Sequence, residues 1–301
     1  MAREAPGLTP AEPGSGYRPP VMRIDLHTHS SMSDGTESPT DLVAAARRAG
    51  LDVVAIADHD TTAGWDEAVD VGRRLGVEVV PAVEISTTYR GADVHLLALW
   101  PDGRNEELQS LLAGIRDGRE QRLPRMLDGL VRHGIHLTVA DVRRAAGPAA
   151  ALGRPHVADA LVAAGVVGSR EEAFAQWLGE GKPGHVSKPA PPLERAIEVV
   201  HAAGGVAVLA HPWGRGSREV LGEADLADLA AAGLDGVEVD HVDHDEADRT
   251  RLRHIAARLG LIVTGASDYH GAGKAGVGLG MNLTDPDAYT ALRSRCRPAP
   301  R

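Results

Sequence analysis

The sequence predicts an α/β protein whose strands form a barrel, and three observations support this fold. Short runs of apolar and β-branched residues alternate with segments of helical periodicity, which is the pattern of repeated βα units and a parallel sheet. Seven such strand-like runs occur, and seven suit a barrel. Most of the helical segments end at glycine, so the order helix, glycine, strand repeats along the chain.

The predicted strands are short and rich in valine, leucine, isoleucine and alanine. In chain order we expect them at residues 21–26, 53–57, 77–83, 94–99, 206–210, 236–239 and 261–264. Between them we expect amphipathic helices at residues 39–49, 65–75, 193–203, 225–232 and 245–259. A glycine ends a helix because it readily adopts the left-handed conformation. The glycines in question are Gly50, Gly76, Gly204, Gly233 and Gly260.

Residues 103–192 break this order, because they contain helical segments punctuated by glycine and proline and no convincing strand. We expect a helical insertion over the mouth of the barrel, between a first part at residues 21–102 and a second part at 193–285. Residues 103–154 carry nine arginines against six aspartates and glutamates, although the whole chain has a net charge of −10. This local positive charge favours an anionic substrate.

Composition limits the other possibilities. With 301 residues, 43% of them hydrophobic, the chain can form one large core, and its negative charge argues against a long nucleic-acid surface. The single cysteine, Cys296, cannot form an intramolecular disulfide, which fits a reducing compartment. No apolar run approaches the ~20 residues of a membrane span. We therefore expect a cytoplasmic protein without membrane contact, a disordered tail at residues 1–20 and a second tail at 286–301.

Six histidines and three carboxylates stand at or near the downstream ends of the predicted strands. They are His27, His29, Asp34, His59, Glu84, His95, His211, Asp268 and His270. The C-terminal ends of barrel strands meet at one face, where the active site forms. Nine such residues are too many for one four-coordinate ion. They fit two or three divalent ions, with manganese, iron or zinc suited to mixed ligands.

Divalent ions a few ångströms apart can convert a bridging water into hydroxide and hold the oxygens of a phosphate. We therefore predict hydrolysis of a small phosphorylated substrate by attack of that hydroxide. Glu84, His211 and Asp268 are the predicted catalytic residues. A water of the metal site or a histidine would protonate the leaving group.

The stretches that carry these residues resemble the PHP (polymerase and histidinol phosphatase) family of the amidohydrolase superfamily. The resemblance runs from about residue 23 to residue 280. It rests on DLHTHSSMSDGTESPTDLVAAARRAGLDVVAIADHDT, the Glu84 strand, VHLLAL, VLAHP and SDYHG. The insertion segments GRPHVADALV and LGEGKPGHV are similar to the branch of 3′,5′-nucleoside bisphosphate phosphatases and a related 5′-to-3′ exoribonuclease.

The resemblance implies a distorted (β/α)7 barrel with three metal ions. The implied ligand groups are His27, His29, Glu84 and Asp268; Glu84, His95 and His211; and Asp34, His59 and His270. Arg154 and His156 would contact the substrate phosphate, a role that suits a planar guanidinium. The implied reaction removes the 3′-phosphate of a 3′,5′-nucleoside bisphosphate, with short oligonucleotides as an extended substrate.

Other interpretations of single residues stay open at this point. Arg154 and His156 flank a proline at a helix start and could simply cap that helix. Asp58 and Asp60 are either partners of metal-binding imidazoles or caps of the next helix. Residues 238–241 receive no role, and the glycine-rich residues 271–276 are expected to form a flexible loop. The histidines expected to be structural or exposed are His133, His136, His185, His201, His241, His244 and His254.

Three other functions also stay open. A phosphatase for histidinol phosphate or a sugar cyclic phosphate would share every metal ligand. A deacylase of the amidohydrolase type would more often use a lysine or one bridging acid between two ions. A non-catalytic metal-binding module would typically have lost ligands, and all nine positions are filled here.

Overall fold

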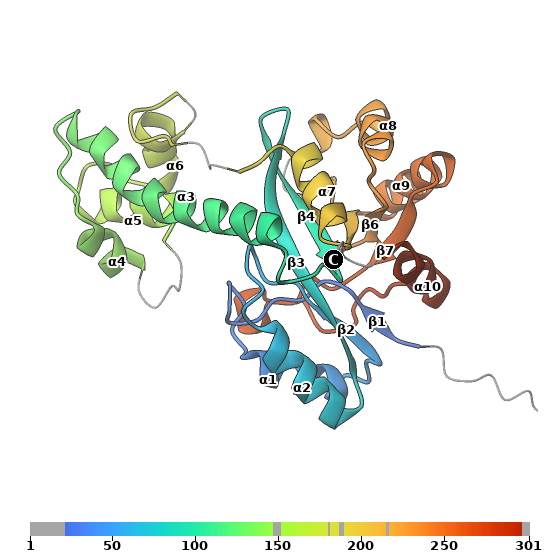
Figure 1. Ribbon diagram of the computed structural model, residues 1–301. Helices are drawn as coiled ribbons and strands as arrows, with labels where there is room; N and C mark the ends of the chain where they lie inside the picture. The colour runs from blue at the N-terminus through green and yellow to red at the C-terminus, as the bar shows by residue number, and fades with distance from the viewer. Residues whose placement is uncertain (1–21, 147–151, 180, 187–189, 215–216, 297–301) are drawn as a thin grey trace, which may run out of the picture.

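The computed structural model shows a nearly closed barrel of seven strands with helices packed around it, as predicted (Figure 1). It describes residues 22–146, 152–179, 181–186, 190–214 and 217–296. The strands lie side by side in chain order. They are β1 (Ile24–Asp25), β2 (Val53–Ile56), β3 (Glu78–Tyr89), β4 (Ala92–Leu99), β5 (Val206–Leu209), β6 (Gly236–Asp240) and β7 (Ile262–Gly265).

The helices predicted for the barrel are confirmed. They are α1 (Pro39–Arg48), α2 (Trp65–Leu75), α7 (Leu193–Ala202), α8 (Glu223–Ala231) and α9 (Glu246–Leu259). Ser38 caps α1 by accepting a hydrogen bond from the backbone N–H of Asp41, and Pro39 occupies the first turn. All five glycines predicted to end helices have positive φ, among them Gly76 and Gly260 at 69° each.

The expectation of an all-parallel sheet is wrong for β4, which runs antiparallel to both β3 and β5. The cause is a tight hairpin in which Arg90 and Gly91 both have positive φ, 46° and 85°, as two-residue hairpin turns require. A parallel β4 would need a crossover helix, for which the short connection has no room. Because β4 is reversed, its first residues lie beside the last residues of β3.

The segments that follow β1 and β7 close the ring. The backbone N–H of Asp268 donates to His27 O at 2.9 Å, and that of His29 donates to Tyr269 O at 2.8 Å. Residues of the first and last predicted ligand pairs are therefore held together by the main chain.

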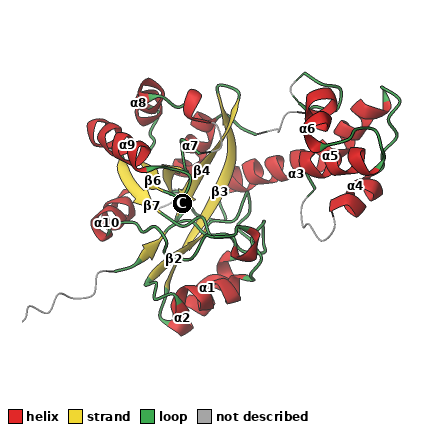
Figure 2. Cartoon of the chain, turned by 180° about the vertical axis from the view of Figure 1, so that it is seen from behind, coloured by secondary structure: helices red, strands yellow, loops and turns green. Residues whose placement is uncertain are grey.

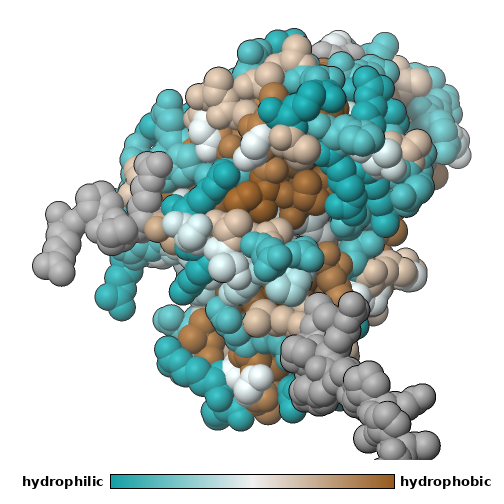
Figure 3. Space-filling model, turned by 90° about the vertical axis from the view of Figure 1, so that its right-hand side faces the viewer, coloured by the Kyte–Doolittle hydropathy of each residue, from teal (hydrophilic) through white to brown (hydrophobic). Residues whose placement is uncertain are grey.

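A further helix, α10 (Pro286–Arg295), covers one end of the barrel. Its Tyr289 and Leu292 are buried in the apolar cluster that fills the barrel interior, together with residues such as Ile24 and Val208. The prediction of a tail from residue 286 is therefore wrong for residues 286–295. Hydrophobic residues gather in the middle of the molecular face at the right of Figure 1, between hydrophilic surfaces (Figure 3). The predicted tail at residues 1–20 lies outside the described residues.

Between β4 and α7 the described residues form helices and loops. The helices are α3 (Glu106–Val131), α4 (Val139–Ala146), α5 (Arg154–Ala163), α6 (Arg170–Ala173) and a π-helix (Phe174–Leu178). The first half of α3 lies against the barrel, and the other helices gather around its far end (Figure 2). Leu127, Leu130, Val157 and Leu161 belong to a separate apolar cluster there, so this part of the chain has a core of its own. None of the helices in the described ranges has the length and apolar composition of a membrane span.

Candidate metal centre

All nine predicted ligands lie in one cluster. They come from the segments after β1, β2, β5 and β7 and from within β3 and β4. Seven of the nine are buried, His59 is half-buried, and Asp34 exposes 48% of its side chain. The cluster is therefore deep and has one edge open to solvent at Asp34.

Glu84 occupies the centre of this cluster. Its Oε1 lies 2.8 Å from His95 Nδ1 and 2.9 Å from His211 Nε2. Its Oε2 lies within 3.3 Å of one ring nitrogen in each of three further histidines. These are His27, His29 and His59. One fully buried carboxylate is thus shared by five imidazoles, as expected of a bridging ligand.

Three groups of side chains bring their ligand atoms within 4.8 Å of one another. They are His27, His29, Glu84 and Asp268; His59, Glu84 and His95; and His29, Asp34, His59 and His270. Two histidines, His29 and His59, belong to two groups each, whereas the resemblance implied one group for each. The two nitrogens of His29 face different ways: Nε2 faces Glu84, and Nδ1 lies 3.5 Å from Asp34 Oδ1.

The spacing of these atoms fits metal ions. His29 Nε2 lies 3.2 Å from both Glu84 Oε2 and Asp268 Oδ1, and 3.0 Å from His27 Nε2. Ligands bonded tetrahedrally at roughly 2.1 Å stand about 3.4 Å apart. Among the described residues, the buried atoms His29 Nδ1, His59 Nδ1 and Glu84 Oε2 have no hydrogen-bond partner. Buried polar atoms are normally paired, so the cluster fits divalent cations.

The charges of the cluster lead to the same conclusion. Burial lowers the pKa of His29, but Asp268 and Glu84 outweigh it and raise that pKa to about 9. Burial likewise raises the pKa of Glu84, but His59, His95 and His27 hold it well below its ordinary value. Without cations the carboxylates therefore require protonated imidazoles beside them. A divalent ion supplies the same positive charge and takes the place of those protons.

Two predicted ligands have a strained backbone. The φ angles of His211 and Asp268 are 28° and 54°, in the left-handed region that residues with a Cβ rarely adopt. Such strain persists only where the surrounding structure enforces it, and it concentrates at functional sites.

Neither interpretation of Asp58 is right. Its carboxylate accepts hydrogen bonds from Ser30 N at 2.7 Å, Ser30 Oγ at 2.6 Å and Ser33 Oγ at 2.7 Å. Asp58 therefore holds the loop that carries Asp34, and it neither orients an imidazole nor caps α2.

Asp60 has a similar role, because it holds the neighbouring strand β3. It accepts hydrogen bonds from Ser86 N at 2.7 Å and Ser86 Oγ at 2.9 Å, two residues after Glu84. The N-terminal cap position of α2 is taken by Gly64, so neither interpretation of Asp60 is right. Asp60 fixes the strand that presents the central carboxylate.

The structure places Arg154 and His156 at the start of α5, away from the nine ligands. His156 Nδ1 accepts a hydrogen bond from the backbone N–H of Gly153 at 3.0 Å, so this histidine caps the helix. Among the described residues, neither side chain forms a hydrogen bond or ion pair with any of the nine. Arg154 is half-buried and lies close enough to Arg122 to lower the pKa of that residue.

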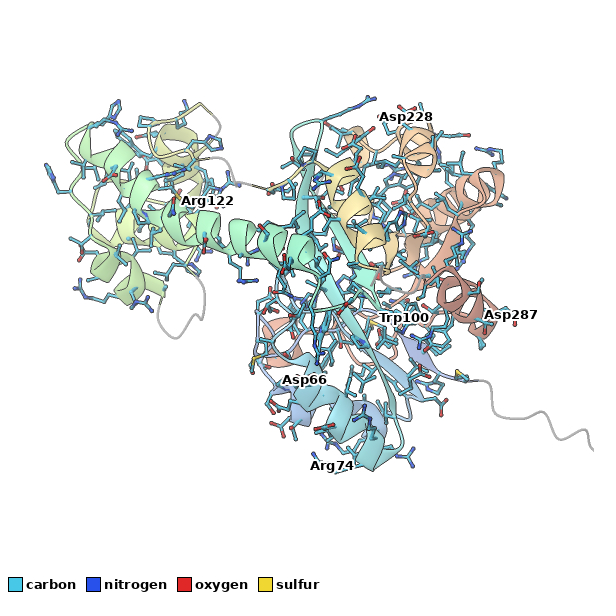
Figure 4. The ribbon with its side chains drawn as sticks, in the orientation of Figure 1. Asp66, Arg74, Trp100, Arg122, Asp228 and Asp287 are labelled. Atoms are coloured by element: carbon cyan, nitrogen blue, oxygen red, sulfur yellow. The ribbon has the colours of Figure 1, made fainter. Side chains whose placement is uncertain are left out.

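Arginines of α3 link the insertion to the cluster, and our sequence analysis did not single them out. Arg116 Nη1 donates to Asp60 O at 2.5 Å, and Arg119 Nη2 donates to Asp60 Oδ2 at 2.5 Å. Arg122, one turn further on, is 9% exposed and donates from Nε to Val186 O at 2.9 Å (Figure 4). Burial, and then the charge of Arg154, lowers the pKa of Arg122. Their spacing of three residues on one helix is the signal that could have identified them.

A small cavity of about 130 Å³ lies beside the cluster. His95 and His211 line it, together with Asp93 and Ser217. Two of the five histidines that contact Glu84 are therefore accessible from this side.

The chain is similar to several known proteins over most of its length. The sequence profile of the PHP domain matches residues 25–139. A 5′-3′ exoribonuclease of Haemophilus influenzae is 34% identical over 88% of this chain and 96% of its own length. A 3′,5′-nucleoside bisphosphate phosphatase of Chromobacterium violaceum is 34% identical over 86% of this chain and 91% of its own. A crystal structure from Bifidobacterium adolescentis, described as a metal-dependent phosphoesterase, is 41% identical, with a TM-score of 0.75, and covers 93% of this chain and 99% of its own.

The barrel and its carboxylate-centred histidine cluster define a hydrolase of the metal-dependent phosphoesterase class. Within that class, the chain belongs to the PHP family.

Proposed function

We propose that this protein removes the 3′-phosphate from 3′,5′-nucleoside bisphosphates and yields 5′-mononucleotides. Short oligonucleotides are an extended form of the same substrate. The observation that carries the proposal is the sharing of Glu84 by five histidines in a cluster that fits several divalent ions. The similarity to the Chromobacterium violaceum bisphosphate phosphatase supports this choice of substrate.

We propose that the nine clustered residues hold two or three ions, with manganese preferred over iron or zinc for this mixture of imidazole and carboxylate. The ligands are His27, His29, Asp34, His59, Glu84, His95, His211, Asp268 and His270. When bound, the ions supply Lewis-acid chemistry: they polarise the phosphoryl group, offset its developing charge and acidify water.

Glu84, His211 and Asp268 are the residues that we propose as catalytic. Burial lowers the pKa of His211 to about 4, so its imidazole is neutral at pH 7 and able to accept a proton or a ligand bond. His211 also lines the cavity beside the cluster, together with His95. Asp268 lies across the cluster, with Oδ1 3.2 Å from His29 Nε2.

The second phosphate of the substrate is assigned to the basic residues of the insertion. Arg154 and His156 are the residues named by the resemblance, and Arg122 is the buried arginine close to Arg154. Two neighbouring guanidinium groups repel one another, and a phosphate between them relieves that repulsion and accepts bidentate hydrogen bonds. We propose that a substrate with two phosphates contacts these basic residues with one phosphate and the metal cluster with the other.

The test is phosphate release from adenosine 3′,5′-bisphosphate by the manganese-loaded protein. The comparison substrates are AMP, histidinol phosphate, a sugar cyclic phosphate and a short 5′-phosphorylated RNA. We expect selective release from the bisphosphate, loss of activity in Asp268→Ala, and normal activity in the matched control Asp228→Ala, whose side chain is 73% exposed (Figure 4). Preference for another phosphoester would overturn the substrate, and inactivity on every substrate would favour a metal-binding module.

A further inference from the structure

Strand β6 stands between two strands that lead to proposed ligands, yet among the described residues it contributes none of the side chains in the three groups. Residues 238–241, the last part of this strand and the residue after it, received no role from the sequence. Glu238 of this strand is nevertheless buried, and so are His241 and His244, which follow the strand. Buried polar groups need partners, so their contacts reveal what they do.

Glu238 contacts two of the proposed ligands, His27 after β1 and His211 after β5. It is 0% exposed, and its Oε1 lies 3.2 Å from His27 Nδ1. Its Oε2 accepts a hydrogen bond from the backbone N–H of His211 at 2.9 Å. A carboxylate can only accept, so His27 carries its proton on Nδ1. The lone pair of His27 Nε2 then faces the cluster, 3.3 Å from Glu84 Oε2.

His241 contacts Asp268, the proposed ligand that follows the other neighbouring strand, β7. The backbone N–H of Asp243 donates to His241 Nδ1 at 3.1 Å, so the ring carries its proton on Nε2. That Nε2 lies 3.4 Å from Asp268 Oδ2. Lys274 Nζ lies 2.7 Å from the same oxygen. With donors at Oδ2, Asp268 turns Oδ1 toward the cluster, 3.2 Å from His29 Nε2.

His244 secures the end of the strand through backbone contacts. Its Nδ1 donates to Val239 O at 2.9 Å, and its Nε2 accepts from the backbone N–H of Trp213 at 3.2 Å. Trp213 is two residues after His211, whose φ is positive. His244 therefore ties the loop of that ligand to the end of β6.

We propose that Glu238 and His241 are positioning residues, which decide the nitrogen of His27 and the oxygen of Asp268 that face the metal ions. Strand β6 thereby sets the metal affinity of the group formed by His27, His29, Glu84 and Asp268. The inference rests on the proposed ligand roles of those four residues, but not on the substrate. A partner of this kind fixes the tautomer of a metal-binding imidazole and raises its basicity.

The test measures manganese binding to the metal-free protein by calorimetry, without substrate. We expect Glu238→Ala and His241→Leu to weaken one binding step by about 10- to 100-fold. His241→Gln keeps an N–H donor near the position of Nε2 and should bind within about threefold of the unmodified protein. The matched controls, Glu246→Gln and His254→Gln, change exposed residues of α9 and should bind normally.

A second readout separates positioning from general damage to the fold. In phosphoester hydrolysis, excess manganese should restore the rate of Glu238→Ala and His241→Leu, because the lost affinity is compensated by concentration. A rate that stays low at saturating manganese contradicts the proposal.

Several results would overturn the inference. One is normal manganese affinity in His241→Leu, which would mean that Lys274 alone orients Asp268. If the alanine and leucine variants do not fold, the glutamine variants decide: Glu238→Gln cannot accept both hydrogen bonds and should bind more weakly than His241→Gln. Weaker manganese binding by His241→Gln than by Glu238→Gln would refute the proposal. Failure of the unmodified protein to bind manganese refutes the ligand assignment instead, and binding without bisphosphate hydrolysis refutes only the substrate.

Discussion

At the scale of single residues, the loop after His270 packs closely against the loop that carries Asp34. Gly271 has φ of 64°, and a Cβ there would lie 2.2 Å from Thr36 Oγ1. That hydroxyl accepts a hydrogen bond from the backbone N–H of Ala272 at 2.9 Å. The glycine-rich loop is therefore held against the loop of Asp34, and it presents Lys274 to Asp268.

Gly271→Ala should destabilise the protein by about 2–4 kcal/mol, because left-handed strain adds to a steric clash. The matched control is Gly276→Ala, where φ is 82° but no atom of the described residues lies within 4 Å of the added Cβ. This control should cost only about 1 kcal/mol. Urea unfolding measures both variants, and equal costs would show that Thr36 imposes no constraint.

Asp235 provides a pH-dependent contact far from the metal cluster. Its Oδ2 lies 2.8 Å from His201 Nε2 and accepts from Ala207 N at 2.9 Å. Burial raises the pKa of Asp235, but His201 and Ala207 outweigh it and hold the pKa below its ordinary value of 3.8.

A carboxyl with a depressed folded-state pKa stabilises the fold above its unfolded pKa, and this contribution is lost as pH falls through the folded value. Asp235→Asn should therefore lower the free energy of unfolding by about 1–3 kcal/mol at pH 7. The difference between the two proteins should shrink below about pH 4. Urea unfolding at several pH values measures it, and a constant difference from pH 7 to pH 3 would contradict the assignment.

At the scale of elements, α10 adds side chains to the apolar cluster inside the barrel. Leu292 is 0% exposed and packs in the inner apolar cluster, and the hydroxyl of Tyr289 donates to Glu78 Oε1 at 2.6 Å. An element that fills the barrel interior contributes to its stability, whatever its position at the end of the sequence.

Leu292→Ala should lower the free energy of unfolding by about 2–5 kcal/mol, because it opens a cavity in a core. Leu75→Ala on α2 is the matched control, since Leu75 is 38% exposed, and it should cost less than about 1 kcal/mol. Thermal and urea unfolding would measure both. A cost for Leu292→Ala no larger than that of the control would show that α10 is not part of the cooperative unit.

At the scale of the whole molecule, the proposed metal ions would link stability to metal binding. Glu84 and Asp268 are both 0% exposed, and together they raise the pKa of His29 to about 9. Folding therefore brings together the proposed ligands, which the unfolded chain keeps apart.

Chelation with EDTA should lower the unfolding temperature, and manganese should restore it. At a free manganese concentration 100 times the dissociation constant, binding to one site adds about 2.7 kcal/mol to the free energy of unfolding. Glu84→Gln should lose most of this response, because Glu84 belongs to two of the three groups. Calorimetric melting with and without metal measures the effect, and an unfolding temperature insensitive to EDTA would contradict a buried metal centre.

The sequence by itself determined the barrel, its five outer helices and the membership of the cluster. These features depend on local signals: apolar periodicity, glycine after a helix, and histidines or carboxylates at strand ends. The same local signals misled us at β4 and α10. The reversal of β4 follows from a two-residue turn, and α10 is anchored by Leu292 in contacts with distant strands.

Only the tertiary structure decided how the cluster is organised. The sharing of Glu84 by five histidines, the roles of Asp58 and Asp60, and the support from β6 all join residues far apart in the chain. Periodicity shows which residues face inward but not which atoms meet there. The pairing of a nitrogen with an oxygen depends on strand order, register and side-chain direction, and these are set when the barrel closes.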